Sequence, residues 1–111
     1  MPTTLKSLTT TDGERMAPLH PGEILFEEFM KPLGLSQCAL ARGLSVPPRR
    51  INQIVHAQRA VSMDTALRLA RYLGTSVELW LGLQTDYELD IAEAGLRARV
   101  EAEVRPLSHT G

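Results

Sequence analysis

The chain has 111 residues, which allows one domain with a modest core and short flanking segments. Hydrophobic residues make up 43% of it but aromatic ones only 5%, which favours a helical core of Leu, Ala, Val and Ile. One cysteine excludes an intramolecular disulfide, and no apolar run approaches the roughly 20 residues that span a bilayer. The N-terminus also lacks a basic-then-apolar signal pattern. We therefore expect a soluble, cytoplasmic, all-α protein that has no membrane partner.

Residues 1 to 19 contain many threonines and scattered apolar residues without a period, so we expect a flexible N-terminal segment. The HPGE run at residues 20 to 23 is typical of a helix start. Proline is accepted in the first helical turn, and an acid there is favoured by the helix dipole.

The first helix is predicted from a stripe of Leu25, Phe29 and Leu33 at a spacing of four, widened by Ile24 and Met30. Pro32 and Gly34 are predicted to end it.

Residues 36 to 59 predict two short helices joined by a tight turn. Ser36 is a natural N-cap for the first. Pro48 suits the first position of the second, where its missing N–H costs nothing. Pro47 then occupies the N-cap position and offers no capping oxygen. The apolar positions that could hold the two helices together are Leu40, Ala41, Leu44, Val46, Ile51 and Ile54.

Between the core positions of the second helix stand Arg49, Arg50, Asn52 and Gln53. Such side chains can donate hydrogen bonds to phosphates and to base edges in a major groove. Charge supports this hypothesis. Residues 29 to 63 contain five basic residues and no acidic one, a net charge of +5 in a chain whose net charge is −1, so the other residues carry −6. A basic face on an acidic body is expected of a nucleic-acid binder. The alternative is a solvated helix face that has no partner.

Two further helices and an extension follow. Ser62 is predicted to cap the fourth helix, whose apolar face is Met63, Ala66, Leu67, Ala70 and Leu73, before Gly74 ends it. Ser76 is predicted to cap the fifth, on which Val77, Trp80, Leu81, Gln84, Tyr87 and Ile91 share a face. After Gly95 the pattern resumes at Leu96, Val100 and Val104, until Pro106 closes it.

These residues together give the chain a family resemblance. The runs HPGEIL, EEF, PLGLSQ, ALRLARYLGTS and W…LQ…YEL occur in order around the predicted helix-turn-helix. With them, the chain from His20 to about Ile91 resembles the HigA family of antitoxins, within the Cro/CI-type (XRE-like, lambda repressor-like) superfamily. The resemblance implies a five-helix DNA-binding domain at residues 20 to 94, with a C-terminal helical extension and tail at 95 to 111. It also implies a homodimer that binds operator DNA, neutralises a HigB-type ribonuclease toxin and represses the shared operon.

The resemblance, together with the exposed polar positions of the second helix, assigns a set of DNA-binding residues: Gln37, Pro48, Arg49, Arg50, Asn52, Gln53 and Arg59. Arg49, Arg50 and Gln53 are predicted to determine sequence preference, and Gln37 and Arg59 to contact the backbone. The chain departs from the superfamily pattern at three places. Ser45 replaces the turn glycine, Pro47 replaces the capping Ser or Thr, and His56-Ala57-Gln58 replaces an Asn-Gly-Lys-like loop.

The apolar positions left over for a dimer interface are Leu83, Tyr87, Ile91, Leu96 and Val100. A toxin-binding surface is predicted at Glu23, Glu27 and Glu28, beside residues 1 to 19, because acids there could attract a basic ribonuclease. Residues 72 to 96 extend this acidic character, since they contain five acids and no Lys or Arg. The alternative is that these acids only keep the dimer soluble and repel DNA from the wrong side.

The sequence offers no spacing typical of a metal, cofactor or catalytic site. His20, His56, His109 and Cys38 lie far apart, and Glu27 adjoins Glu28 on a helix, so the two cannot face one site. We therefore expect no enzyme activity. Three interpretations stay open: an autorepressing antitoxin, a stand-alone regulator of the same fold without a toxin, and an interaction module that has lost DNA binding.

Overall fold

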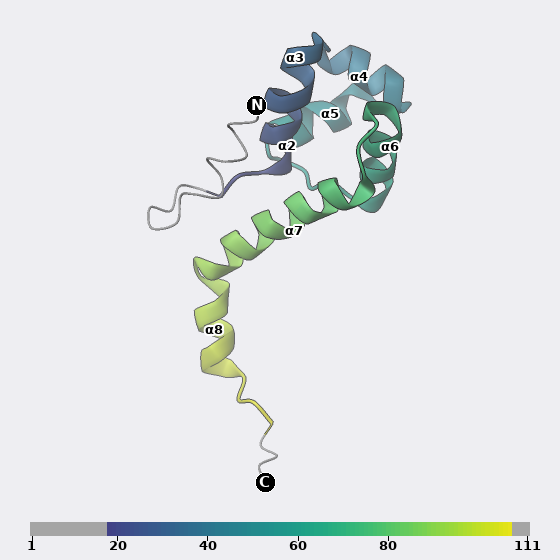
Figure 1. Ribbon diagram of the computed structural model, residues 1–111. Coiled ribbons are helices and arrows are strands. Elements are labelled where there is room, and N and C mark those ends of the chain that lie inside the picture. Colours follow the sequence, from purple (N-terminus) through teal and green to yellow (C-terminus); the bar gives the residue numbers. More distant parts are fainter. Residues whose placement is uncertain (1–17, 108–111) are drawn as a thin grey trace.

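The computed structural model describes residues 18–107, which form helices and no strand, so the all-α prediction is confirmed. The predicted flexible segment, apart from residues 18 and 19, and His109 lie outside the described residues. The elements are α2 (Pro21–Ile24), the π-helical η1 (Leu25–Met30), α3 (Lys31–Leu33), α4 (Gln37–Leu44), α5 (Pro48–Val55), α6 (Met63–Leu73), α7 (Val77–Glu93) and α8 (Leu96–Glu103). The helices α2 to α6 gather at one end, and α7 leads away from them into α8 (Figure 1).

The core lies where η1, α4, α5 and α6 meet the start of α7. All six apolar residues predicted to join the helix-turn-helix are buried: Leu40, Ala41, Leu44, Val46, Ile51 and Ile54. Trp80 of α7 is fully buried and packs its ring 5.3 Å from that of Phe29. Its Nε1 donates to Thr75 Oγ1 at 2.7 Å, so the polar end of the indole is satisfied as well. One tryptophan thus connects α7 to the first helix.

Serine caps begin three of the helices as predicted. The hydroxyl oxygens of Ser36, Ser62 and Ser76 each accept a hydrogen bond from the amide three residues later, at 3.0 to 3.3 Å. Each bond satisfies one of the amides that have no intrahelical partner at a helix start. Gly74 ends α6 in the left-handed region with φ 75°, also as predicted.

The first helix differs from its prediction in its middle. α2, η1 and α3 follow one another without a break, and the Lys31 amide bonds to the Phe26 carbonyl, five residues earlier. Leu25 and Met30, also five residues apart, are consequently the buried pair of this π-helical turn. The predicted stripe is therefore confirmed at Ile24, Leu25 and Met30, which are buried, and at Phe29, which is half-buried against the core.

Pro32 does not end the first helix, contrary to the prediction. It lies within α3, and the helix ends at Gly34, which is left-handed with φ 66°. In a regular α-helix the proline ring would collide with the carbonyl four residues earlier, and the wider π turn relieves that collision. Leu33, predicted to belong to the apolar stripe, is 61% exposed.

The buried face of α6 is rotated from the predicted one. Thr65, Ala66, Leu69 and Ala70 are buried, whereas Met63 and Leu67 are exposed. Ala66 and Ala70 belong to the predicted face and to the observed one. Their spacing of four alone therefore did not determine whether Leu67 or Leu69 would be buried beside them.

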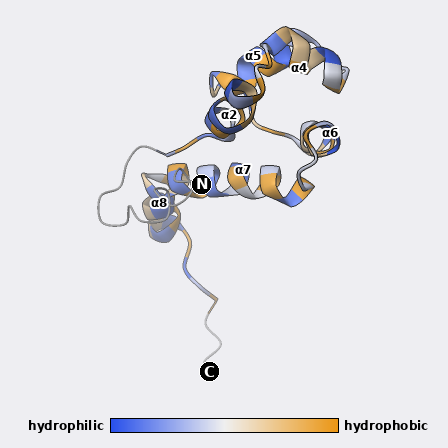
Figure 2. Ribbon diagram, turned by 45° about the horizontal axis from the view of Figure 1, so that its top comes forward, coloured by the Kyte–Doolittle hydropathy of each residue, from blue (hydrophilic) through white to orange (hydrophobic). Residues whose placement is uncertain are grey.

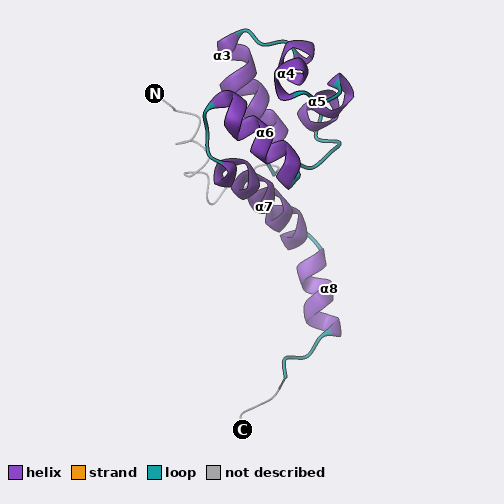
Figure 3. Ribbon diagram, turned by 90° about the vertical axis from the view of Figure 1, so that its right-hand side faces the viewer, coloured by secondary structure: helices purple, strands orange, loops and turns teal. Residues whose placement is uncertain are grey.

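Hydrophobic residues recur along α7 up to α8, which continues away from the body of the domain (Figures 2 and 3). Gly95 separates the two helices, and every residue of α8 is exposed. Within residues 18–107, no helix is long and apolar enough to cross a membrane.

Candidate nucleic-acid interface

The helix-turn-helix consists of α4, the turn at residues 45–47 and α5. Ser45 occupies the position of the expected turn glycine and takes the left-handed conformation, with φ 58° and ψ 47°. Pro47 is the N-cap of α5, has φ −65° and ψ 143°, and supplies no side-chain cap. Both departures from the superfamily pattern therefore leave the backbone geometry in place, at a cost in strain and in one missing cap.

The side chains predicted to contact DNA lie on or beside α5, and hydrogen bonds connect several of them. Gln37, which opens α4, accepts from Asn52 Nδ2 at 3.0 Å. Arg59 Nη1 donates to Gln53 Oε1 at 3.0 Å. The polar ends of four predicted contact residues thus stand side by side in two bonded pairs, which limits their freedom before any ligand arrives.

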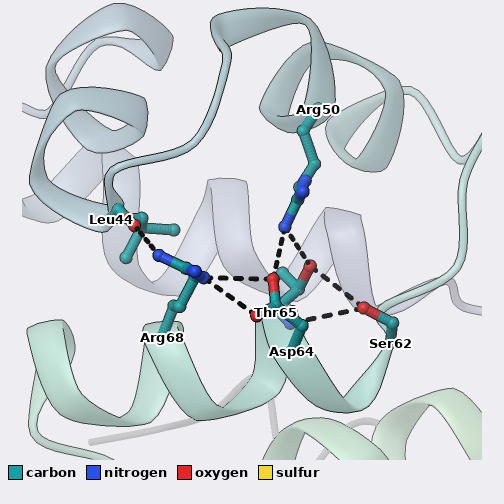
Figure 4. Close-up of polar contacts among 6 residues, drawn as sticks. All are labelled: Leu44, Arg50, Ser62, Asp64, Thr65 and Arg68. Carbon is teal, nitrogen blue, oxygen red and sulfur yellow. Dashed lines mark hydrogen bonds and ion pairs between the residues drawn. The ribbon is translucent and has the colours of Figure 1, made fainter.

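The two arginines of α5 differ in their surroundings. Arg49 is exposed and makes no ion pair with the part of the chain that the structure describes. Pro48, one position earlier, is also exposed and can offer only apolar contact. Arg50 instead turns toward α6, where its Nη1 lies 2.6 Å from Asp64 Oδ2, and its side chain is 24% exposed (Figure 4). Arg50 was expected to be exposed and is half-buried instead, while its contact with DNA stays a prediction.

The loop after α5 is fixed at several points. Ala57 takes the place of a glycine and is left-handed with φ 59°. The Gln58 amide donates to the Gln53 carbonyl at 2.7 Å. The buried Gln84 of α7 accepts from the Val61 amide at 2.8 Å. Since Arg59 lies within this loop, α7 takes part in holding a predicted DNA-contacting residue in place.

His20 has a structural role that its place in the sequence did not reveal. It is buried, caps α2 by accepting from the Gly22 amide at its Nδ1 (2.9 Å), and meets the Tyr87 ring edge-on at 4.7 Å. Burial lowers the pKa of His20, against the opposing effects of Glu23 and the Arg59 backbone. The only local signal was its place directly before a proline, which did not reveal the long-range contact with α7.

Comparison with known proteins agrees with this geometry. Residues 26–80 match the sequence model of a protein family whose description is helix-turn-helix. Virulence-associated protein I of Dichelobacter nodosus is 56% identical over 78 residues, which cover 70% of this chain and 72% of that protein. The structure of the Pseudomonas aeruginosa antitoxin HigA with the higBA promoter is 46% identical, with a TM-score of 0.76, over 81% of this chain and 98% of that one. This chain belongs to the HigA family of helix-turn-helix proteins. The structure of antitoxin GraA in complex with its operator is likewise similar, at 43% identity and a TM-score of 0.78, over 88% of this chain and 99% of that one.

In this HigA-family chain, the residues predicted for a dimer interface fall into two groups. Leu83 is half-buried against the core of its own chain, and Tyr87 is half-buried against His20. The other three, Ile91, Leu96 and Val100, are exposed on α7 and α8. Leu83 and Tyr87 thus pack within their own chain, whereas the three exposed residues are accessible to a second copy.

The acids predicted to bind a toxin all lie on the first helix. Glu23 is exposed, whereas Glu28 is half-buried. Glu27 is exposed but forms an ion pair with Lys31 at 3.1 Å, four residues further along. Such a surface pair is weak and can exchange for a partner's basic group.

Proposed function

We propose that this protein is a DNA-binding antitoxin that represses its own operon and neutralises a HigB-type ribonuclease toxin in the cytoplasm. The observation that supports this most is the exposed first turn of α5, where Arg49 makes no ion pair within residues 18–107, beside the bonded pairs of Gln37 with Asn52 and Gln53 with Arg59. Relatives with this fold are known in complex with an operator or promoter DNA. The basic charge of residues 29 to 63 favours the same ligand.

Arg49→Ala should lower the affinity for operator DNA by about 1–3 kcal/mol and relax the preference at one base pair in each half-site. The measurement is a mobility-shift titration with the DNA upstream of the gene and with random DNA, at two salt concentrations. Arg71→Ala is the matched control, because Arg71 is an exposed arginine of α6 that lies beside Gly43 and Leu44, at the end of α4 away from Gln37. Equal operator binding by both variants and the unchanged protein would contradict the assignment of α5 as the recognition helix.

Toxin neutralisation is proposed through the exposed acids of the first helix, Glu23 and Glu27, together with the chain that precedes them. These acids could attract a basic partner without occupying the DNA-facing side of α5. Co-expression with the product of the adjacent gene tests this half of the proposal. Relief of growth arrest supports the antitoxin. Operator binding without any toxin in the neighbouring genes supports the alternative, a stand-alone regulator.

We also propose that the protein is a homodimer joined through α7 and α8. Ile91, Leu96 and Val100 are all exposed on these helices. A helix of eight residues such as α8 is marginal in water unless another surface packs on it. Two copies related by a dyad would present their recognition helices to successive major grooves, about 34 Å apart, which a single copy cannot do.

Leu96→Asp should convert the dimer to a monomer at micromolar concentration. Both copies lose a buried leucine, so the change costs about 3–6 kcal/mol of association free energy. Sedimentation velocity measures the change. Leu33→Asp is the matched control, because Leu33 is similarly exposed (61%, against 57% for Leu96) but lies on α3. A dimer that persists in Leu96→Asp, or that dissociates equally in Leu33→Asp, would contradict this interface.

A further inference from the structure

One polar network connects the recognition helix to the two helices beside it. Arg50 of α5 donates from Nη1 to Asp64 Oδ2 at 2.6 Å and lies 3.5 Å from Thr65 Oγ1, both on the first turn of α6. Arg68, one turn further along α6, donates from Nε to both carboxylate oxygens of Asp64, at 3.0 and 3.1 Å. Figure 4 shows that the Asp64 carboxylate lies between the two guanidinium groups.

The network continues from α6 to the end of α4. Arg68 Nη1 donates to the Leu44 carbonyl at 2.9 Å. Leu44 is the last residue of α4, and carbonyls at a helix end lack an intrahelical partner. Asp64 itself stands in the first turn of α6, where a negative charge is favoured by the helix dipole. The Asp64 carboxylate of α6 thus binds Arg50 of α5 directly. It also binds Arg68, which in turn donates to the last carbonyl of α4.

The start of α5 needs such support from outside the helix. Its N-cap, Pro47, supplies no hydrogen bond, and the turn before it contains the left-handed Ser45. The helix has only eight residues. Arg50 lies in the first turn of α5, so its ion pair acts at the place where the local sequence stabilises the helix least. For Arg50 to reach a base edge instead, it would have to break a charge-assisted hydrogen bond to Asp64.

We propose that Arg50 is a positioning residue that orients the recognition helix through Asp64 and Arg68, and that Arg49 rather than Arg50 supplies direct base contact. The inference rests on the operator binding proposed above. Its consequence is that Asp64, an acidic residue on a different helix, determines sequence preference without touching DNA.

Asp64→Asn distinguishes positioning from direct contact, because the two roles predict opposite effects. If Asp64 positions α5 through Arg50, Asp64→Asn lowers operator affinity about tenfold and leaves random-DNA affinity unchanged or slightly raised. If Arg50 contacts a base, Asp64→Asn frees it and removes a nearby negative charge, so operator affinity stays equal or rises. Asp86→Asn makes the same change on α7 and controls for the loss of one negative charge; we expect no change in the operator-to-random ratio.

The double variant Arg50→Ala/Asp64→Asn completes the test. Positioning through one shared network predicts that the double variant binds the operator no more weakly than Arg50→Ala alone. It also predicts that Arg50→Ala weakens the preference at every base pair of the half-site. Loss of preference at a single base pair, or fully additive losses in the double variant, would show that Arg50 contacts DNA and would overturn the inference.

Hydrogen exchange gives a readout that requires no DNA. In Asp64→Asn the amides of residues 50–53 should exchange about tenfold faster than in the unchanged protein, while those of the middle of α7 keep their rates. Unchanged exchange at residues 50–53 would overturn the inference even if Asp64→Asn weakened operator binding. Absence of operator preference in the unchanged protein, with the exchange effect present, would instead contradict the proposed function alone.

Discussion

Replacing Gly22 with alanine should destabilise the domain by about 3 kcal/mol, near the upper end of what overpacking costs. A Cβ at this position would lie 1.8 Å from the Ile54 carbonyl oxygen and 2.7 Å from its carbonyl carbon, both of which are backbone atoms. Neither can move without displacing α5, because Ile54 is itself fully buried. Gly22 is therefore required for the close approach of α2 to the recognition helix.

Thermal unfolding followed by far-ultraviolet circular dichroism measures this effect. For a domain of this size, about 3 kcal/mol corresponds to a Tm lower by roughly 12–24 °C. Gly82→Ala is the control, since a Cβ on Gly82 meets no atom within 4 Å among the described residues. It replaces a glycine inside α7 and should stabilise that helix by up to about 1 kcal/mol. Similar melting of the two variants would mean that α2 can withdraw from α5 at little cost.

Trp80→Ala should have the other large effect, a loss of about 3–5 kcal/mol in the free energy of unfolding. Trp80 is fully buried, contacts Phe29 and donates to Thr75, so its removal leaves a cavity between α7 and the first helix. Small domains have only about 5–15 kcal/mol of total stability, so this loss is a large fraction of the total.

Urea titration of the circular dichroism signal measures that loss. Thr75→Val separates the hydrogen bond from the packing of the ring, because it removes the acceptor and keeps the indole; its cost should be about 1 kcal/mol. If Thr75→Val cost as much as Trp80→Ala, the indole N–H rather than the buried ring would be the dominant contribution of this residue.

The features that could be predicted from the sequence are those determined within one helical turn or one buried stripe. The caps at Ser36, Ser62 and Ser76 depend on an oxygen and an amide three residues apart, and all three form. The left-handed Ser45 was indicated by the family resemblance, because Ser45 takes the place of the superfamily's turn glycine. Trp80 and Gln84, at a spacing of four, are both buried as their shared face indicated.

The features that the sequence did not reveal depend on residues far apart in the chain. Arg50 could have faced solvent, and only the position of Asp64, fourteen residues later, turns it inward. His20 is buried because Tyr87 of α7 packs on it. The sequence therefore indicated which types of polar residue form the candidate interface. It did not distinguish Arg50, which forms an ion pair with Asp64, from Arg49, which makes no ion pair within residues 18–107.

The exposure of α8 determines how the chain should respond to a protease. All its residues are exposed, its ion pairs lie on the surface, and Gly95 separates it from α7. Such a segment opens at a small free-energy cost, so cleavage should begin there while α2 to α7 remain folded. A nick near Gly95 would leave a fragment that keeps the helix-turn-helix and Ile91 but lacks Leu96 and Val100 of the surface proposed for pairing. Pairing through α7 and α8 would cover the cleavage site near Gly95. Because a larger fraction of molecules is paired at higher protein concentration, the intact chain should then survive proteolysis longer.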